Sequence, residues 1–421
     1  MPLNTMYYHH NLHLQSMLNF EQNDPHLAKL AKMPYIFSSK ILNQLSFHIP
    51  GIYTLSGGRQ IGKTTLLKQW MHKLLLEKFH ANSIYFMSGE VINDHIHLIH
   101  EIENILNELP VKILIIDEIT YINNWDKGMK FLADAGKISN IVVVLTGSDS
   151  LIIQEARMRF PGRRGCADQC DFHYFPLSFN EVVSLKKGNN LLEQFNQYQI
   201  HGGYLTAINE YKTLGKISTS TYQTYSDWVR GDIQKKNKQE NYLRSIIRGI
   251  IKRYGSQLTW NSLAKELPIN HPSTIIDYVQ LLKACDVCIE IESLIEEKLS
   301  GAPKKARKIF FTDPFIMQAL AQWANVPILD GHRGSIVESI VLSHFKRNFS
   351  TFYINAEGEV DVAYIKGKEF YPIEVKWTEQ IRVKDLKQIR KYKNGEIWGK
   401  NECLESIPPI YFLPQKLMDI K

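Results

Sequence analysis

The sequence predicts an α/β protein that begins with a parallel β-sheet domain and continues into a helical region and a second α/β domain. From about residue 48 to 175, short apolar segments alternate with amphipathic ones, as in parallel sheets covered by helices on both faces. Near the start of this region, the pattern Gly-x4-Gly-Lys-Thr at residues 57–64 follows the apolar run 52–55. The chain has 421 residues, too many for a single hydrophobic core.

The first domain is expected at residues 46–175, after a polar, His-rich N-terminal segment at 1–45 with one helical patch at 26–32. Its expected strands lie near residues 52–55, 83–87, 112–116 and 141–146. Its expected helices lie near residues 63–78, 91–108 and 125–137.

The rest of the chain is expected to contain a helical region at 176–240, a winged-helix-like domain at 241–313 and an α/β domain at 314–421. The winged-helix order comes from helices at 242–254, 259–267 and 273–284 and strands at 287–292 and 307–312. The last domain is expected to hold helices at 335–347 and 383–393 and strands at 351–354, 359–365, 369–376 and 409–413.

Composition narrows the class of protein. No apolar stretch reaches the ~18–20 residues of a membrane span, and the N-terminus lacks the form of a signal peptide. The five cysteines make no disulfide framework at this length, and their odd number fits a reducing cytoplasm. Because Cys288 lies in an apolar strand, small core thiols are expected rather than a zinc site. A net charge of +7 permits a nucleic-acid partner without requiring one.

The glycine pattern at 57–64 has the chemistry of a phosphate-binding loop. Gly57 and Gly62 let backbone N–H groups point at phosphate oxygens, and Lys63 supplies a charge for the β- and γ-phosphates. The Thr64 hydroxyl is expected to take one position on Mg²⁺. The nucleotide-binding residues expected here are Gly57, Gly58, Arg59, Gln60, Ile61, Gly62, Lys63, Thr64 and Thr65.

A second motif extends this site. The apolar strand 113–116 ends in Asp117 and Glu118, the form of a Walker B motif. Asp117 is expected to hold Mg²⁺, and Glu118 to polarise the water that attacks the γ-phosphate. The extra strand at 83–87 and the glutamate after the aspartate favour an ATPase. Because no guanine-reading motif follows, ATP is preferred over GTP.

Two more residues are candidates for contact with the γ-phosphate. Ser148 follows the strand 141–146 at the place of a residue that senses this phosphate, although serine is also an ordinary turn residue. Arg163 follows Pro161 and Gly162 and offers a guanidinium to the transferred phosphate. It acts between subunits, within its own chain, or only solvates a loop.

Several motifs together resemble a known family. They are GGRQIGKTTLLKQW, LIIDEI, LTGSDS, Gly162-Arg163, PLSFNE, HGGY and KIFFTD. The combination is similar to prokaryotic AAA-type P-loop ATPases whose C-terminal half is a domain of unknown function, and it covers most of the chain after about residue 48. Gly58 departs from the family, which often has Pro there, but this position contributes backbone only.

The last domain holds a second set of polar residues. Asp361 and Glu374 lie in two expected strands. If these strands pair as a hairpin, both carboxylates can meet on one face and hold Mg²⁺. Lys376 shares the face of Glu374 and can orient a water or offset charge. Glu338, on the preceding helix, is a further ligand candidate. Acidic and basic residues also alternate on many half-exposed strands without any catalytic role.

This set, in its α-β-β-β-α-β order, resembles the PD-(D/E)XK (restriction-endonuclease-like) fold. The resemblance implies that Glu374 and Lys376 are catalytic and that Glu338, Asp361 and Glu374 hold Mg²⁺ or Mn²⁺. Folds are reused without their chemistry, so nuclease activity is a separate question from the fold.

A cluster of basic residues favours non-sequence-specific DNA binding. Eight lie between residues 230 and 253, and a basic loop runs from Lys298 to Lys308. The expected recognition helix 273–284 is mainly apolar, which speaks against base reading. We therefore expect a cytoplasmic Mg²⁺-dependent ATPase coupled to a nuclease-like domain that acts on or binds DNA. One alternative is a nucleotide-gated switch for a protein partner, which includes the case of a homo-oligomer. The other is a DNA-binding regulator, and in both the C-terminal domain is inert.

Overall fold

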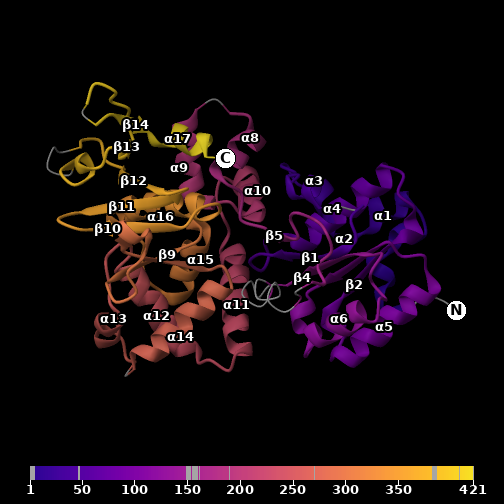
Figure 1. Ribbon diagram of the computed structural model, residues 1–421. Helices are drawn as coiled ribbons and strands as arrows, with labels where there is room; N and C mark the ends of the chain where they lie inside the picture. The colour runs from indigo at the N-terminus through magenta and orange to yellow at the C-terminus, as the bar shows by residue number, and fades with distance from the viewer. Residues whose placement is uncertain are drawn as a thin grey trace. The chain divides into compact units, whose positions relative to one another are not determined.

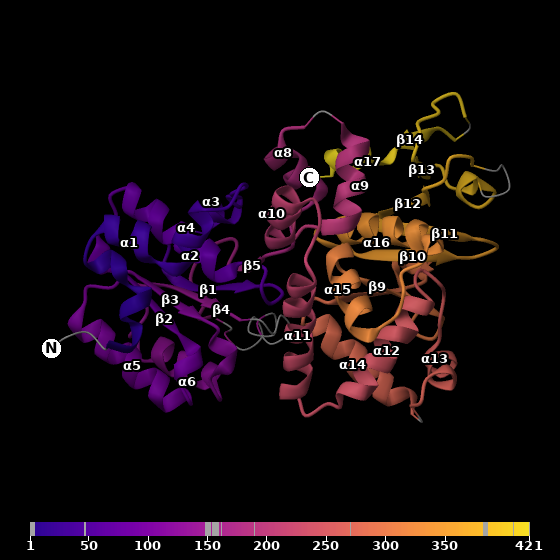
Figure 2. The same cartoon turned by 180° about the vertical axis from the view of Figure 1, so that it is seen from behind.

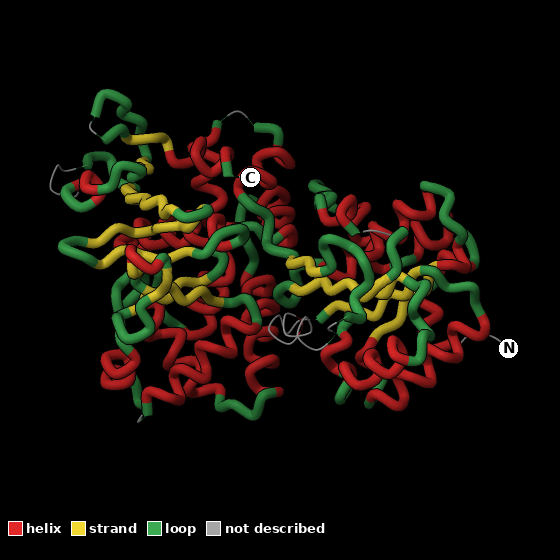
Figure 3. The backbone as a smooth tube through the Cα atoms, in the orientation of Figure 1, coloured by secondary structure: helices red, strands yellow, loops and turns green. Residues whose placement is uncertain are grey.

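The computed structural model describes residues 5–45, 48–147, 153, 160, 162–188, 190–269, 271–381, 386–406 and 408–420. The chain folds into two compact units, Met1–Phe175 and Pro176–Lys421. Figure 1 labels their elements, and Figure 3 shows that both units combine helices with strands. The finer division of the second unit into 176–240, 241–313 and 314–421 stays a prediction.

The first unit is built on a five-stranded parallel sheet with the order β2-β3-β4-β1-β5. The strands are β1 (Gly51–Ser56), β2 (Ile84–Ser88), β3 (Ile113–Asp117), β4 (Val142–Thr146) and β5 (Asp171–His173). The predicted α/β class with a parallel sheet is therefore confirmed. The sequence missed β5 because three residues are too few to show a strand pattern.

Helices cover both faces of this sheet (Figures 1 and 2). In β3, Ile113 and Ile115 belong to the core beneath one layer of helices, whereas Leu114 and Ile116 belong to the core on the opposite face. This double burial explains why the strands read as unbroken apolar runs. The first layer contains α1 (Met17–Asn23), α3 (Ile41–Gln44) and α4 (Lys63–Leu76), and the second contains α5 (His95–Glu108) and α6 (Trp125–Asp134).

The N-terminal segment packs into the first unit. The Asn11 side chain exchanges two hydrogen bonds of 2.8 Å with the backbone of Phe86, and a ring nitrogen of His13 lies 3.0 Å from the carbonyl oxygen of Ile84. These contacts satisfy polar groups of the edge strand β2, which would otherwise be open to pairing with another chain. The segment contains short 3-10 turns at Thr5–His10 and Leu12–Leu14 and a helix α2 (Pro25–Ala31).

The second unit begins with a run of helices. They are α8 (Phe179–Lys186), α9 (Leu191–His201), α10 (Leu205–Leu214), α11 (Thr219–Lys235), α12 (Glu240–Lys252), α13 (Trp260–Glu266) and α14 (Pro272–Ala284). An antiparallel pair follows, β6 (Cys288–Glu292) with β9 (Arg307–Phe311), and between them lie β7 (Leu294–Ile295) and β8 (Ser300–Gly301). The helix α15 (Pro314–Ala324) was not predicted. It is buried on most of its surface, so its sequence lacks a polar face.

The unit ends in a mixed sheet with the order β10-β11-β12-β13-β14, where β10 to β12 are antiparallel and β12 to β14 parallel. The strands are β10 (Thr351–Asn355), β11 (Glu359–Lys366), β12 (Glu369–Lys376), β13 (Glu396–Gly399) and β14 (Ile410–Phe412). Helix α16 (Arg333–Lys346) packs against the first three, and α17 (Leu413–Asp419) against the last two.

The helix expected at 383–393 is not observed over its described part, residues 386–393, which contains only a 3-10 turn at Ile389–Lys391. The chain instead turns at Tyr392–Gly395 to enter β13, and the Gly395 N–H donates to the carbonyl of Tyr392. Within the described ranges, no helix has the length and apolarity that a membrane crossing requires.

Candidate functional site

The loop between β1 and α4 has a backbone that only glycine accommodates at two positions. Gly57 has φ = +149°, and a Cβ atom there would lie 2.5 Å from the carbonyl oxygen of Tyr174. Gly62 has φ = +102° and is the N-cap of α4. The backbone therefore curls at both ends of the loop and delivers the chain to the N-terminus of a helix, where anions bind.

Lys63 lies inside this curl. Its side chain is almost fully buried, and Nζ donates to the carbonyl oxygens of Gly57 at 2.9 Å and Gly58 at 3.0 Å. The ammonium group is thus held at the centre of the loop rather than in solvent. A buried positive charge beside a helix N-terminus is suited to the oxygens of a polyphosphate.

Asp117 is fixed by two hydroxyl groups from neighbouring elements. Thr64 Oγ1 donates to Asp117 Oδ2 at 2.6 Å, and Thr146 Oγ1 donates to Asp117 Oδ1. The same Thr146 hydroxyl accepts a hydrogen bond of 3.1 Å from the backbone N–H of Glu118. One hydroxyl at the end of β4 therefore positions both acidic residues that the sequence predicts.

Thr146 was not among the predicted site residues. The residue predicted from the sequence was Ser148, two positions further along, which lies outside the described residues. The signal for Thr146 is a polar residue closing an apolar strand. β4 lies directly beside β3 in the sheet, so the carboxyl ends of the two strands meet.

The residues at this point fit a magnesium ion. Thr64 and Asp117 present a hydroxyl oxygen and a carboxylate oxygen side by side, and Mg²⁺ takes hard oxygen ligands of this kind together with phosphate oxygens and water. Glu118, next to them, has the left-handed backbone conformation, φ = +53°. This conformation is uncommon for a residue with a side chain and recurs at functional sites.

The remaining loop residues have separate contacts. Arg59 donates to the hydroxyl of Tyr121, and Gln60 has φ = +59°. Thr65 Oγ1 lies 3.4 Å from Nδ1 of His26 in the N-terminal segment. Gly58 and Ile61 complete the loop between these contacts.

Arg163 is not brought to the loop of its own chain. It forms an ion pair with Asp134 at the C-terminal end of α6, with Nε 2.5 Å from Oδ1. The next residue, Arg164, donates to the carbonyl of Ile52 at the amino end of β1. The loop follows the carboxyl end of the same strand, and six residues of strand span roughly 20 Å. The predicted role of Arg163 stays a prediction.

In the second unit, the pairing of β11 with β12 brings Asp361 and Glu374 together. Val362 is opposite Ile373, which sets Asp361 across from Glu374. The Val375 N–H donates to Asp361 Oδ2 at 2.8 Å. Lys376 forms an ion pair with Glu374, with Nζ 2.5 Å from Oε1.

A lysine that the sequence reasoning placed in the basic loop lies in this group of acids. Lys308, in β9, is fully buried, with Nζ 2.8 Å from Glu338 Oε1, 2.5 Å from Glu359 Oε1 and 4.0 Å from Asp361 Oδ1. The expectation that Lys308 belongs to a solvent-facing basic loop is therefore wrong, because this residue lies in β9 with its side chain turned inward. We call Glu338, Glu359, Asp361 and Glu374 the carboxylate cluster.

Burial and charge oppose each other in the carboxylate cluster. Burial raises the pKa of Glu338, and burial with the nearby Asp361 carboxylate raises the pKa of Glu374. Burial alone lowers the pKa of Lys308, but attraction to the carboxylates outweighs it, so the net pKa lies above the ordinary value. Among the described residues, no three His, Cys, Asp or Glu side chains are arranged to hold a metal ion.

Many of the basic side chains considered for nucleic-acid contact are paired within the chain. Arg248 donates to the carbonyl of Ala324 at 2.6 Å, and Arg307 contacts Glu290 at 2.8 Å. Further ion pairs are Arg230 with Glu240, Lys238 with Asp277, Arg244 with Glu240 and Arg253 with Glu266. Exposed lysines are Lys235, Lys236, Lys252, Lys298, Lys304 and Lys305.

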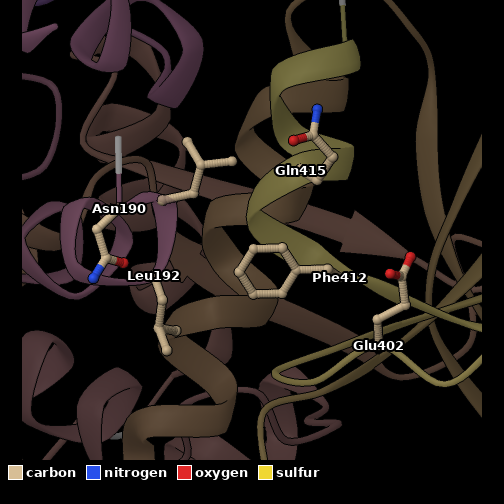
Figure 4. A pocket seen from close by; sticks show the side chains of 6 residues that line it. Asn190, Leu192, Glu402, Phe412 and Gln415 are labelled. Carbon is tan, nitrogen blue, oxygen red and sulfur yellow. The ribbon is translucent and has the colours of Figure 1, made fainter. Parts of the chain in front are cut away.

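The second unit also has a hollow of about 600 Å³ (Figure 4). Figure 4 shows the ring of Phe412 in it, with Asn190 and Leu192 on one side and Glu402 and Gln415 on the other. None of the predicted site residues lines this hollow.

Two family models match the chain. Residues 50–183 match an AAA domain, and residues 192–326 match a domain of unknown function (DUF8612). An uncharacterized protein of Methanocaldococcus jannaschii is 25% identical over 406 residues, which cover 86% of this chain and 83% of that protein. A second uncharacterized protein of the same organism is 23% identical over 366 residues, with 81% and 78% covered.

Solved structures of low identity are also similar. A Walker-type ATPase of Pyrococcus abyssi has a TM-score of 0.46 at 15% identity and covers 66% of this chain and 93% of its own. The Orc1 protein of Aeropyrum pernix in complex with DNA has a TM-score of 0.34 at 11% identity, with 76% and 94% covered. The family match over residues 50–183 and the geometry of the loop between β1 and α4 together support a P-loop ATPase domain of the AAA type in the first unit.

Proposed function

We propose that this chain binds Mg·ATP in its first unit and hydrolyses it, and that the second unit responds to the nucleotide by changing its contact with a partner. One observation carries the hydrolysis proposal: Thr64, Asp117 and Thr146 form a continuous hydrogen-bonded group beside the phosphate-binding loop. A loop that only held a phosphate would not need a fixed carboxylate in contact with its threonine.

Each residue has a distinct role in this proposal. Lys63 and the loop backbone bind the β- and γ-phosphates, while Thr64 and Asp117 hold Mg²⁺, which neutralises phosphate charge when it is bound. Glu118 accepts a proton from the attacking water or orients that water. Thr146 holds Asp117 and the backbone of Glu118 in place. ATP rather than GTP, and a cytoplasmic location, remain proposals from the sequence.

For the second unit, we favour binding over cleavage. The nuclease-like site was predicted from Asp361, Glu374 and Lys376, and these residues are neighbours on β11 and β12. However, the carboxylate cluster is paired internally with lysines. This supports the alternative of an inert C-terminal domain that serves as a binding scaffold.

DNA without sequence preference is the proposed partner. Lys298, Lys304 and Lys305 are exposed in the segment between β7 and β9, where they can contact phosphates. A protein partner, including a second copy of the chain, is the rival.

The test is the rate of ATP turnover by the full-length protein with Mg²⁺, in the presence and absence of DNA. Lys63→Ala should abolish turnover, whereas Lys130→Ala, a half-exposed lysine on α6, should leave it unchanged. DNA that accelerates turnover supports the DNA partner, and turnover indifferent to DNA supports a protein partner. Turnover that survives Lys63→Ala would contradict the proposed site.

A further inference from the structure

We propose that Lys308 is the resident cation of the carboxylate cluster and that it keeps divalent metal ions out. This inference concerns the second unit and does not depend on ATP hydrolysis in the first. It replaces the expectation that Glu338, Asp361 and Glu374 hold Mg²⁺ or Mn²⁺ with an internal ammonium group at the same place.

The Lys308 ammonium group connects several elements of the second unit. It lies within hydrogen-bonding distance of Glu338 from α16 and of Glu359 from β11, so one side chain joins three elements. Only 1% of the side chain is exposed. It also lies 5.5 Å from the centre of the Tyr353 ring, whose electron-rich face attracts cations. An ammonium group in such a place is an integral part of the packing.

Several carboxylate oxygens of the cluster already accept hydrogen bonds or form ion pairs. Glu338 Oε1 and Glu359 Oε1 accept from Lys308, and Glu359 Oε2 accepts from the side-chain amide of Gln257 at 2.5 Å. Asp361 Oδ2 accepts the backbone N–H of Val375, and Glu374 Oε1 pairs with Lys376. Glu374 Oε2 is buried and has no hydrogen-bond partner among the described residues, but one free oxygen does not supply the near-octahedral ligands of Mg²⁺, which would have to displace several of the other bonds at once.

Strand β9 is fixed on both sides of Lys308. The Tyr353 hydroxyl donates to the carbonyl of Ala306 at 2.6 Å, and the Phe311 N–H donates to the Tyr254 hydroxyl at 3.2 Å. Strand pairing sets Lys308 opposite Ile291 of β6. The backbone from which the Lys308 side chain extends is therefore fixed, and the side chain itself is fully buried.

Removal of this charge should leave a site for a metal. Without the ammonium group, the carboxylates of Glu338, Glu359 and Asp361 face one another with no positive charge between them. Carboxylates that lie close together without a compensating cation repel each other, and a bound divalent cation relieves this repulsion. The cluster should therefore bind a divalent metal ion when Lys308 is removed and bind none when Lys308 is present.

The experiment titrates Mn²⁺ into the full-length protein without nucleotide and measures free Mn²⁺ by electron paramagnetic resonance. Asp117→Asn is present in every sample to remove the metal ligand of the first unit. With Lys308 intact, no stoichiometric site should be found. Lys308→Met should gain one site, with affinity raised roughly tenfold or more because ligand charge sets affinity.

Two controls locate the site. Asp361→Asn should abolish the gain in the Lys308→Met background, and Lys305→Met, at an exposed lysine of the same segment, should produce no gain. In thermal unfolding, Mn²⁺ should raise the Tm of the Lys308→Met protein and leave the Tm of the proteins with Lys308 unchanged.

Two results would overturn the proposal. One is stoichiometric Mn²⁺ binding with Lys308 intact that Asp361→Asn removes, since metal and lysine would then share the cluster. The other is a folded Lys308→Met protein that gains no site. If Lys308→Met does not fold, the comparison of the Lys308-intact protein with and without Asp361→Asn still decides the question.

Discussion

Thr146→Val is the sharpest perturbation of the nucleotide site. Valine keeps the shape of threonine and removes the one hydroxyl that holds Asp117 and the N–H of Glu118. Thr146 is fully buried, so water does not replace the lost bonds easily. The variant therefore tests whether this hydroxyl, and not the acidic residues alone, prepares the site.

The magnitude follows from the two bonds. A hydrogen bond to a charged group is worth about 1.5–3 kcal/mol, and an unsatisfied buried N–H costs about 1–3 kcal/mol. The two terms overlap, so a loss of roughly 2–4 kcal/mol in the free energy of unfolding of the first unit is expected. If about 2 kcal/mol of this also stabilises the transition state, kcat falls roughly 30-fold.

A matched control separates catalysis from stability. Thr54, in β1, is also buried and donates to a carboxylate, Asp171 Oδ1, at 2.5 Å. Thr54→Val should lower stability by about 1.5–3 kcal/mol without changing kcat. The assays are urea unfolding and steady-state ATP turnover at saturating Mg·ATP. A wild-type kcat in Thr146→Val would refute the positioning role of Thr146. So would a fall in kcat in Thr54→Val as large as that in Thr146→Val.

Further predictions concern the loop and the N-terminal segment. Gly57→Ala places a Cβ atom 2.5 Å from the carbonyl of Tyr174, so ATP affinity measured by calorimetry should fall roughly tenfold or more, and wild-type affinity would contradict the loop geometry. Burial lowers the pKa of His13 to about 4, below the ~6.5 of the unfolded chain, so its contribution is present above pH 6.5 and is lost as the pH falls towards 4. Between pH 7 and 4, the free energy of unfolding measured with urea should fall by about 3 kcal/mol more in the wild-type protein than in His13→Gln. The same dependence of the free energy of unfolding on pH in both proteins would contradict this prediction.

Much of the first unit could be predicted because its signals are local. The motif at Gly57–Thr65 depends on a few adjacent residues, and apolar strands between amphipathic helices give the sheet. The order β2-β3-β4-β1-β5 brings Thr146 beside Asp117, and no spacing in the sequence shows that neighbourhood. The packing of the N-terminal segment on β2 was missed because side-chain to backbone bonds such as those of Asn11 leave no periodic pattern.

In the second unit, the sequence predicted part of the carboxylate cluster but not the lysine that lies inside it. The hairpin that joins Asp361 and Glu374 follows from strand alternation, and its register agrees with the expectation. Lys308 lies 53 residues before Asp361 in a run of basic residues that reads as a solvent-facing loop. Only the three-dimensional packing of β9 turns it inward to the carboxylates, and this changes the meaning of the whole cluster.

The first unit is proposed to hydrolyse ATP with Glu118 as the general base. The most direct measurement is ATP turnover by the full-length Glu118→Gln protein beside its ATP affinity. Turnover should fall by roughly a hundredfold or more, as for loss of a general base, while ATP should still bind with near wild-type affinity. Unchanged turnover in a variant that binds ATP normally would contradict it.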